Sequence, residues 1–124
     1  PTEISSILES VRNVFKNKKI ISVFEPHRYS RVLSLKKEFA KSFIKSDLVL
    51  LCPLYAAGEK RDSRYDQINF GKLIAKLSQT QVILLKDLSE ISIYLKKNLF
   101  KDELIIGMGA GLISKSIREL QRTI

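Results

Sequence analysis

Cysteine and histidine are almost missing from the 124 residues, which contain one of each, Cys52 and His27. A single cysteine excludes an internal disulfide and a zinc site built from several cysteines, and a single histidine excludes a site built from several histidines. Cys52 lies in an apolar run, so we expect a small core residue rather than a nucleophile. This cysteine usage fits a reducing cytoplasm, and we expect no bound metal.

Long apolar runs and nucleotide-binding motifs are missing as well. No stretch is long enough to cross a membrane, and a hydrophobic content of 44% excludes a disordered chain. The pattern G-x-x-x-x-G-K-[ST] does not occur, so the chain has no recognisable phosphate loop for ATP. The sequence begins with proline and has no apolar leader, which indicates a processed chain or a piece of a longer protein.

Acidic residues are fewer than basic ones, with 13 Asp and Glu against 22 Lys and Arg, which gives a formal net charge of +9. Such an excess raises the question of an anionic partner. The lysines are spread over many segments, however, and no aromatic residues alternate with them as they do in single-strand nucleic-acid binders. A solvated surface is therefore favoured, and we expect no nucleic-acid or membrane partner. A small basic nucleic-acid-binding domain is the alternative.

Hydrophobic periodicity divides the chain into alternating helices and strands. Apolar residues at steps of three and four predict helices, and short runs of β-branched and apolar residues predict buried strands. In one helix, over residues 30–45, we expect Leu35, Phe39, Phe43 and Ile44 to face inward. The other expected helices run through residues 2–15, 70–77, 91–95 and 113–124, and the expected strands through residues 20–24, 47–52, 81–85 and 103–107.

This alternation predicts the fold class. Strands separated by helices of ten or more residues favour a parallel sheet, because each crossover is long enough for a right-handed β-α-β unit. We therefore expect an α/β fold: a three-layer, Rossmann-like domain with a mostly parallel sheet and helices on both faces. Residues 1–124 are expected to form one domain. In such a sheet, ligand-binding loops follow the carboxyl ends of the strands.

The first of these loops has the sequence E-P-H-R-Y-S-R and covers residues 25–31. Arg28 and Arg31 are three residues apart, so they project from the same side if the helix has begun, where the helix dipole adds positive potential. Guanidinium groups bind carboxylates and phosphates through paired hydrogen bonds, which predicts an anion site. The alternative is that both arginines form ion pairs with surface acids. For His27, a role in orienting substrate competes with that of a strand-end residue making one backbone bond.

The second loop has the sequence Y-A-A-G-E and covers residues 55–59. Its small residues let the backbone approach a ligand closely, and Glu59 can receive an amine or orient an arginine. The alternative is a plain turn with a solvated glutamate.

The third loop, G-M-G-A-G at residues 107–111, follows the last predicted strand. It differs from the dinucleotide-binding fingerprint in spacing, and that fingerprint follows the first strand of its fold rather than the last. The three glycines nevertheless make a dinucleotide-binding domain a second alternative.

Four segments taken together carry a family resemblance. They are P-T-E-I before the first helix, F-E-P-H-R-Y-S-R after the first strand, L-Y-A-A-G-E after the second and M-G-A-G after the fourth. The first and last are common strings, whereas P-H-R-Y-S-R followed by Y-A-A-G-E at this spacing is specific. In this combination the chain resembles, from end to end, the C-terminal domain of the Mur ligase family.

The resemblance implies a three-domain cytoplasmic ligase of peptidoglycan synthesis, with this chain as the third domain. The implied substrates are UDP-N-acetylmuramate and L-alanine, and the full-length enzyme would use ATP and Mg²⁺ to form an acyl phosphate that the amine attacks. The partners of this chain would be the other domains of the ligase. Without them we expect the chain to be inactive, with no catalytic residue of its own and no bound cofactor.

The family motifs also imply which residues contact substrate. They place His27, Arg28 and Arg31 on the substrate side of the cleft. The second motif would line the same edge with Tyr55, Ala56, Ala57, Gly58 and Glu59. Leu112 is a departure, because the family usually has a polar residue after M-G-A-G.

Overall fold

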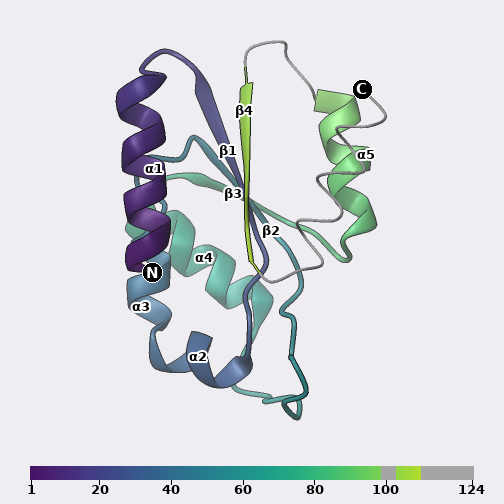
Figure 1. The fold of residues 1–124 in the computed structure, drawn as a ribbon. Coiled ribbons are helices and arrows are strands. Elements are labelled where there is room, and N and C mark those ends of the chain that lie inside the picture. The colour runs from purple at the N-terminus through teal and green to yellow at the C-terminus, as the bar shows by residue number, and fades with distance from the viewer. Residues whose placement is uncertain (99–102, 110–124) are drawn as a thin grey trace.

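The computed structural model describes residues 1–98 and 103–109, and within them four strands form one sheet (Figure 1). The strand order is β3-β2-β1-β4, and each neighbouring pair is parallel. The α/β class and the parallel sheet are therefore confirmed. The strands are β1 (Lys19–Phe24), β2 (Leu48–Leu51), β3 (Gln81–Leu84) and β4 (Glu103–Met108).

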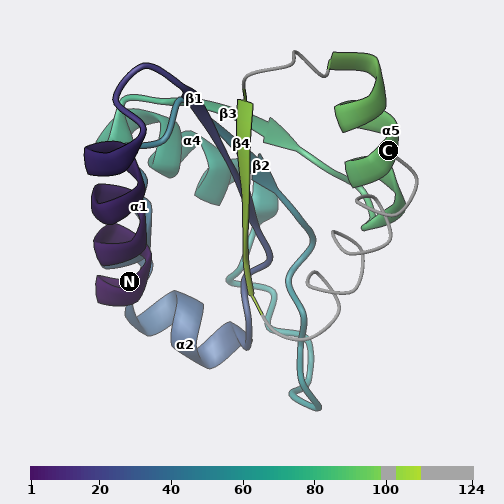
Figure 2. The same ribbon diagram turned by 45° about the horizontal axis from the view of Figure 1, so that its top comes forward.

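Helices cover both faces of this sheet, as the predicted three-layer arrangement requires. Figures 1 and 2 show α1, α3 and α4 on one face and α5 on the other, with α2 beyond the end of the sheet. The helices are α1 (Thr2–Val14), α2 (Tyr29–Ser34), α3 (Lys36–Ala40), α4 (Gln67–Ser78) and α5 (Ser89–Asn98). None of the helices in these described ranges has both the length and the apolarity that crossing a membrane requires. The helix expected over residues 113–124 lies outside the described residues.

Two apolar cores follow from this layering, because alternate residues of a strand face opposite sides of the sheet. Ile20 and Phe24 of β1 pack on the side of α1, α3 and α4, whereas Ile21 and Val23 pack on the side of α5. Cys52 is fully buried in the second core, which confirms its expected role as a small core residue. Burial, and secondly the charge of Glu25, raises the pKa of the Cys52 thiol to about 12, so the thiol stays protonated.

The helix expected over residues 30–45 is the main difference between prediction and structure. Two short helices, α2 and α3, take its place, and Leu35 between them leaves the helical conformation at φ −117° and ψ 27°. Val32 of α2 and Phe39 of α3 are both buried on either side of this break. Phe43 is buried as expected, but the prediction for Ile44 was wrong: its exposed fraction is 61%. It lies beyond the end of α3, where helical spacing no longer applies.

Helix α4 is held at both ends and packs closely on the sheet. The Asp66 carboxylate accepts a hydrogen bond of 3.0 Å from the amide of Ile68, which is a regular N-cap. Gln79 ends the helix in the left-handed conformation, at φ 51° and ψ 46°. At Gly71 a β-carbon would lie 2.7 Å from the Leu84 side chain, so glycine allows the helix to approach β3.

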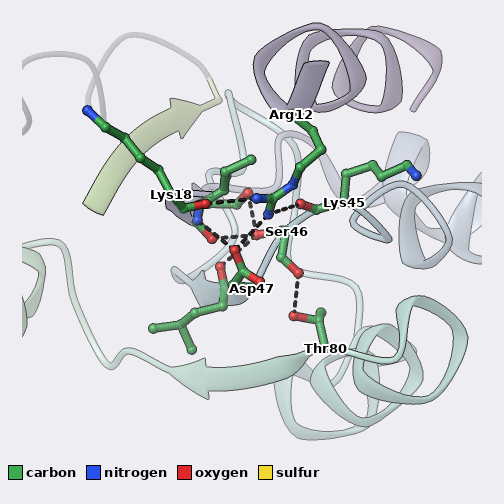
Figure 3. Close-up of polar contacts among 9 residues, drawn as sticks. Arg12, Lys18, Lys45, Ser46, Asp47 and Thr80 are labelled. Carbon is green, nitrogen blue, oxygen red and sulfur yellow. Dashed lines mark hydrogen bonds and ion pairs between the residues drawn. The ribbon is translucent and has the colours of Figure 1, made fainter. Parts of the chain in front are cut away.

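A network of hydrogen bonds ties α1 to the amino end of the sheet (Figure 3). The Arg12 guanidinium donates to the carbonyls of Lys18 and Lys45 at 2.8 and 2.9 Å and pairs with the Asp47 carboxylate at 2.7 Å. The same carboxylate oxygen accepts the amide of Ile20 at 2.8 Å. This network, which we call the Arg12–Asp47 network, satisfies three backbone groups from two segments of the chain with two side chains.

Candidate anion site at the carboxyl end of the sheet

A cavity of about 400 Å³ opens between the carboxyl ends of β1 and β4. The chain steps from β1 to β2 to β3 in one direction, and β4 then returns to the other side of β1, so this is where the strand order reverses. Ligands of open α/β sheets bind at such a switch point. The lining residues are Pro1, Glu3, Ile4, Ile7, Phe24, Glu25, His27, Arg31, Phe39, Gly107, Met108 and Gly109.

Arg31 provides positive charge at this cavity. It lies in the short helix α2, is exposed, and lines the cavity together with His27. Neither Arg31 nor Arg28 forms an ion pair with an acid in the described parts of the chain, so the alternative of two surface ion pairs finds no support there. A guanidinium without a carboxylate partner is available to bind an anion from outside the domain.

Arg28 occupies a different position from the one we expected. It precedes α2 as the N-cap residue, at φ 66° and ψ 127°, so the helical spacing used to place it beside Arg31 does not apply. A non-glycine residue with this backbone conformation is strained, and such strain persists where the surrounding contacts fix it. The cavity lining does not include Arg28.

Backbone hydrogen bonds fix the conformation of Arg28 by joining the two predicted loops. The amide of Arg28 donates to the Tyr55 carbonyl at 2.9 Å, and the amide of Tyr55 donates to the Pro26 carbonyl at 2.8 Å. His27 and Tyr55 thereby form an isolated parallel β-bridge, with their rings stacked at a centroid distance of 5.6 Å and an angle of 8°. The structure therefore brings P-H-R-Y-S-R and Y-A-A-G-E together.

The remainder of the second motif is a tight turn that directs Glu59 toward α2. Ala57 and Gly58 both have positive φ, at 53° and 88°, and the amide of Glu59 donates to the Ala56 carbonyl at 3.1 Å. The Glu59 carboxylate accepts hydrogen bonds from the Ser30 hydroxyl at 2.5 Å and the Ser30 amide at 3.1 Å. These two bonds, the hydroxyl first, lower the pKa of Glu59 below its usual value.

The loop between Glu59 and α4 carries a second, separate set of contacts. Asp62 and Arg64 form an ion pair at 2.6 Å, and the hydrogen bonds from the Arg64 side chain hold the pKa of Asp62 at about 2. Tyr65 packs edge-on against Tyr29 and Phe70, and burial raises the pKa of its hydroxyl. This loop therefore packs against the first motif as well, through Tyr29.

Sequence reasoning did not identify Ser30 as the partner of Glu59 or the apolar floor of the cavity. A contact between segments this far apart in the sequence leaves no local pattern that would reveal it. The one available hint was chemical: a serine near a helix start can donate a hydrogen bond to a glutamate. Phe39 was predicted only as an inward-facing residue, and it lines the cavity together with the buried residues Ile4 and Phe24. From the third motif, Gly107 and Gly109 line the cavity, whereas Ala110, Gly111 and Leu112 lie outside the described residues.

Comparison with known proteins finds UDP-N-acetylmuramate–L-alanine ligases among the curated relatives of the chain. It is 43% identical over 124 residues to the UDP-N-acetylmuramate–L-alanine ligase of Pelagibacter ubique, a match that covers all of this chain and 27% of that protein. The ligase of the same name from Sulfurihydrogenibium is 37% identical and is matched over 93% of this chain and 25% of its own length. The chain thus spans about a quarter of these relatives. No family model matches it.

Solved structures show the same fold. A murein peptide ligase from Psychrobacter arcticus has a TM-score of 0.73 at 14% identity, and the match covers 98% of this chain and 25% of that one. A ligase domain from Haemophilus ducreyi has a TM-score of 0.68 at 20% identity, over 99% and 82% of the two chains. These likenesses support the fold, and the sequence matches confirm the resemblance first seen in the motifs.

Proposed function

We propose that this chain, whose whole length is homologous to part of UDP-N-acetylmuramate–L-alanine ligases, is the C-terminal domain of such an enzyme. The enzyme would join L-alanine to UDP-N-acetylmuramate in peptidoglycan synthesis, in the cytoplasm. This domain would supply contacts to the substrate and close over the reaction site, and the other domains of the ligase would be its partners.

The observation that supports this proposal most strongly is the union of the two motifs at the switch point. P-H-R-Y-S-R and Y-A-A-G-E are held together by the bridge between His27 and Tyr55, beside a cavity that Arg31 lines. An arginine at such a cavity suits the carboxylate of an amino acid or of the muramoyl group. We propose that Arg31 and His27 contact substrate there, with Arg28, Tyr55, Ala56, Ala57, Gly58 and Glu59 forming the adjoining edge.

We propose that ATP and Mg²⁺ are bound outside residues 1–98 and 103–109. The sequence has no phosphate loop, and no group of three metal-ligating side chains occurs within residues 1–98 and 103–109. In our proposal the rest of the ligase holds both, and the nucleotide supplies the phosphoryl group that activates the muramoyl carboxylate. Closure of this domain would exclude water from the activated carboxylate and align the amine of L-alanine.

Kinetics of the full-length ligase test the proposal. The wild-type enzyme should form UDP-N-acetylmuramoyl-L-alanine in the presence of ATP, and the 124-residue chain alone should not. Arg31→Ala should lower kcat/KM about 100-fold, the equivalent of about 2.7 kcal/mol, because a charge-assisted contact to substrate is lost. Arg28→Ala should lower it as well.

A matched control is Arg64→Ala, which also removes a loop arginine but one that pairs with Asp62. Its kcat/KM should stay within about twofold of wild type, since exposed ion pairs contribute little. Unchanged kinetics in both the Arg28 and Arg31 variants, or a wild-type ligase that forms no product, would contradict the proposed function.

A further inference from the structure

The start of α2 has no cap of its own. An N-cap residue normally accepts a hydrogen bond from one of the first helical amides, and serine, threonine, aspartate and asparagine do this best. In α2 this position belongs to Arg28, whose guanidinium has only donors. The first amides of α2 therefore need an acceptor from another part of the chain.

Glu59 provides that acceptor from the second motif. One carboxylate oxygen lies 3.1 Å from the amide of Ser30, the second residue of α2, and the other lies 2.5 Å from the Ser30 hydroxyl. The backbone of Tyr29 and the charge of Arg28 lower the pKa of Glu59 further. The carboxylate thus occupies the place of an N-cap side chain, where the helix dipole favours negative charge.

We propose that Glu59 is a positioning residue that holds Arg31 at the cavity by capping α2 through Ser30, an inference that rests on the proposed role of Arg31. Glu59 then acts through another residue, rather than by receiving the amine of the substrate. Each of its two carboxylate oxygens already accepts a hydrogen bond from Ser30, so the contacts present in the structure tie Glu59 to α2.

The size of α2 explains why such a contact matters. The helix has six residues, fewer than two turns, and an isolated helix of that length is unstable in water. Inside the domain it is held by Val32, which is fully buried, and by the edge-on contact of Tyr29 with Tyr65. The Glu59 cap adds a hydrogen-bonded contact at the helix start, which helps to fix the direction of the helix and therefore of Arg31.

A double-mutant cycle in the full-length ligase tests this inference. Glu59→Gln should lower kcat/KM for L-alanine about tenfold, since it weakens charge-assisted bonds to the helix start. In the Arg31→Ala background the same substitution should change kcat/KM by less than about twofold, because the residue through which it acts is gone. Ser30→Ala should show a smaller effect in the same direction, because the bond from the Ser30 amide remains.

Asp62→Asn is the matched control, because it removes the same charge from the same loop without touching α2. Its kcat/KM should equal that of wild type, and melting temperatures of all variants should show that each one folds. Independent losses that multiply in the double variant would overturn the inference, because Glu59 would then act on the substrate directly or on the whole fold. So would wild-type kinetics in Glu59→Gln. A wild-type ligase that forms no product instead overturns the proposed function itself.

Discussion

The two ends of the sheet contrast in how their arginines are used. At the amino end, Arg12 is bound to two carbonyls and to Asp47, and that carboxylate also binds a strand amide. At the carboxyl end, Arg28 and Arg31 have no ion pair with a described acid, and Arg28 adopts a strained backbone conformation. At the amino end the polar groups of the network bind one another, whereas at the carboxyl end two guanidinium groups have no described carboxylate in an ion pair with them.

From this contrast we expect stability and the proposed function to depend on opposite ends of the sheet. A satisfied network at a part-buried position stabilises the fold, because breaking it leaves amides or carbonyls without a partner. Strain and unpaired charge do the opposite, and they are retained where a ligand or another domain completes the arrangement. We therefore expect substitutions at the amino end to change the free energy of unfolding and those at the carboxyl end to change ligation.

The largest effect on stability should come from Asp47→Ala. It removes the partner of Arg12 and leaves the amide of Ile20, a fully buried residue, without an acceptor. The free energy of unfolding should fall by about 2 to 3 kcal/mol, most of it from the unsatisfied amide, because an ion pair this exposed adds at most about 1 kcal/mol. Urea unfolding of the 124-residue chain measures this loss.

Asp47→Asn is the conservative comparison for that experiment. Its side-chain oxygen can still accept from Ile20, so the loss should be about 1 kcal/mol. In the full-length ligase, both variants should keep wild-type KM for L-alanine below their melting temperature. A large rise in KM would break the proposed separation of the two ends, as would equal stability losses for alanine and asparagine.

Arg28→Gly should have a smaller effect, of the opposite sign on stability. Glycine adopts φ near 66° without a steric penalty, so the free energy of unfolding should rise by about 1 kcal/mol, while ligation falls because the guanidinium is gone. Gln79→Gly is the matched control, because Gln79 has positive φ near the amino end, after α4. It should stabilise the chain without changing kcat/KM. Stabilisation by neither variant would show that positive φ carries no strain here.

Much of this architecture was predictable from the sequence, because burial imposes a period on strands and helices. The alternation of apolar runs predicted the parallel sheet, and it placed the loop that carries Arg28 and Arg31 and the Y-A-A-G-E turn at one end of it. The break at Leu35 had no such signal, since Val32 and Phe39 are spaced as they would be in one continuous helix. Contacts between segments far apart in the sequence, such as Glu59 with Ser30 or Arg12 with Asp47, depend on the complete fold.

The smallest expected effect is a titration confined to the carboxyl end. The hydroxyl and amide of Ser30 lower the pKa of Glu59, so its cap contributes stability above the pKa of the unfolded chain, and that contribution is lost as pH falls through the lower, folded pKa. The amide resonance of Ser30 should therefore shift with a midpoint below 4.5, the ordinary value for glutamate. In Ser30→Ala, followed through the amide of residue 30, the midpoint should move up toward that value. A midpoint at 4.5 in the wild-type chain would mean that Glu59 does not cap α2 in solution, and the two ends of the sheet would then differ only in their arginines.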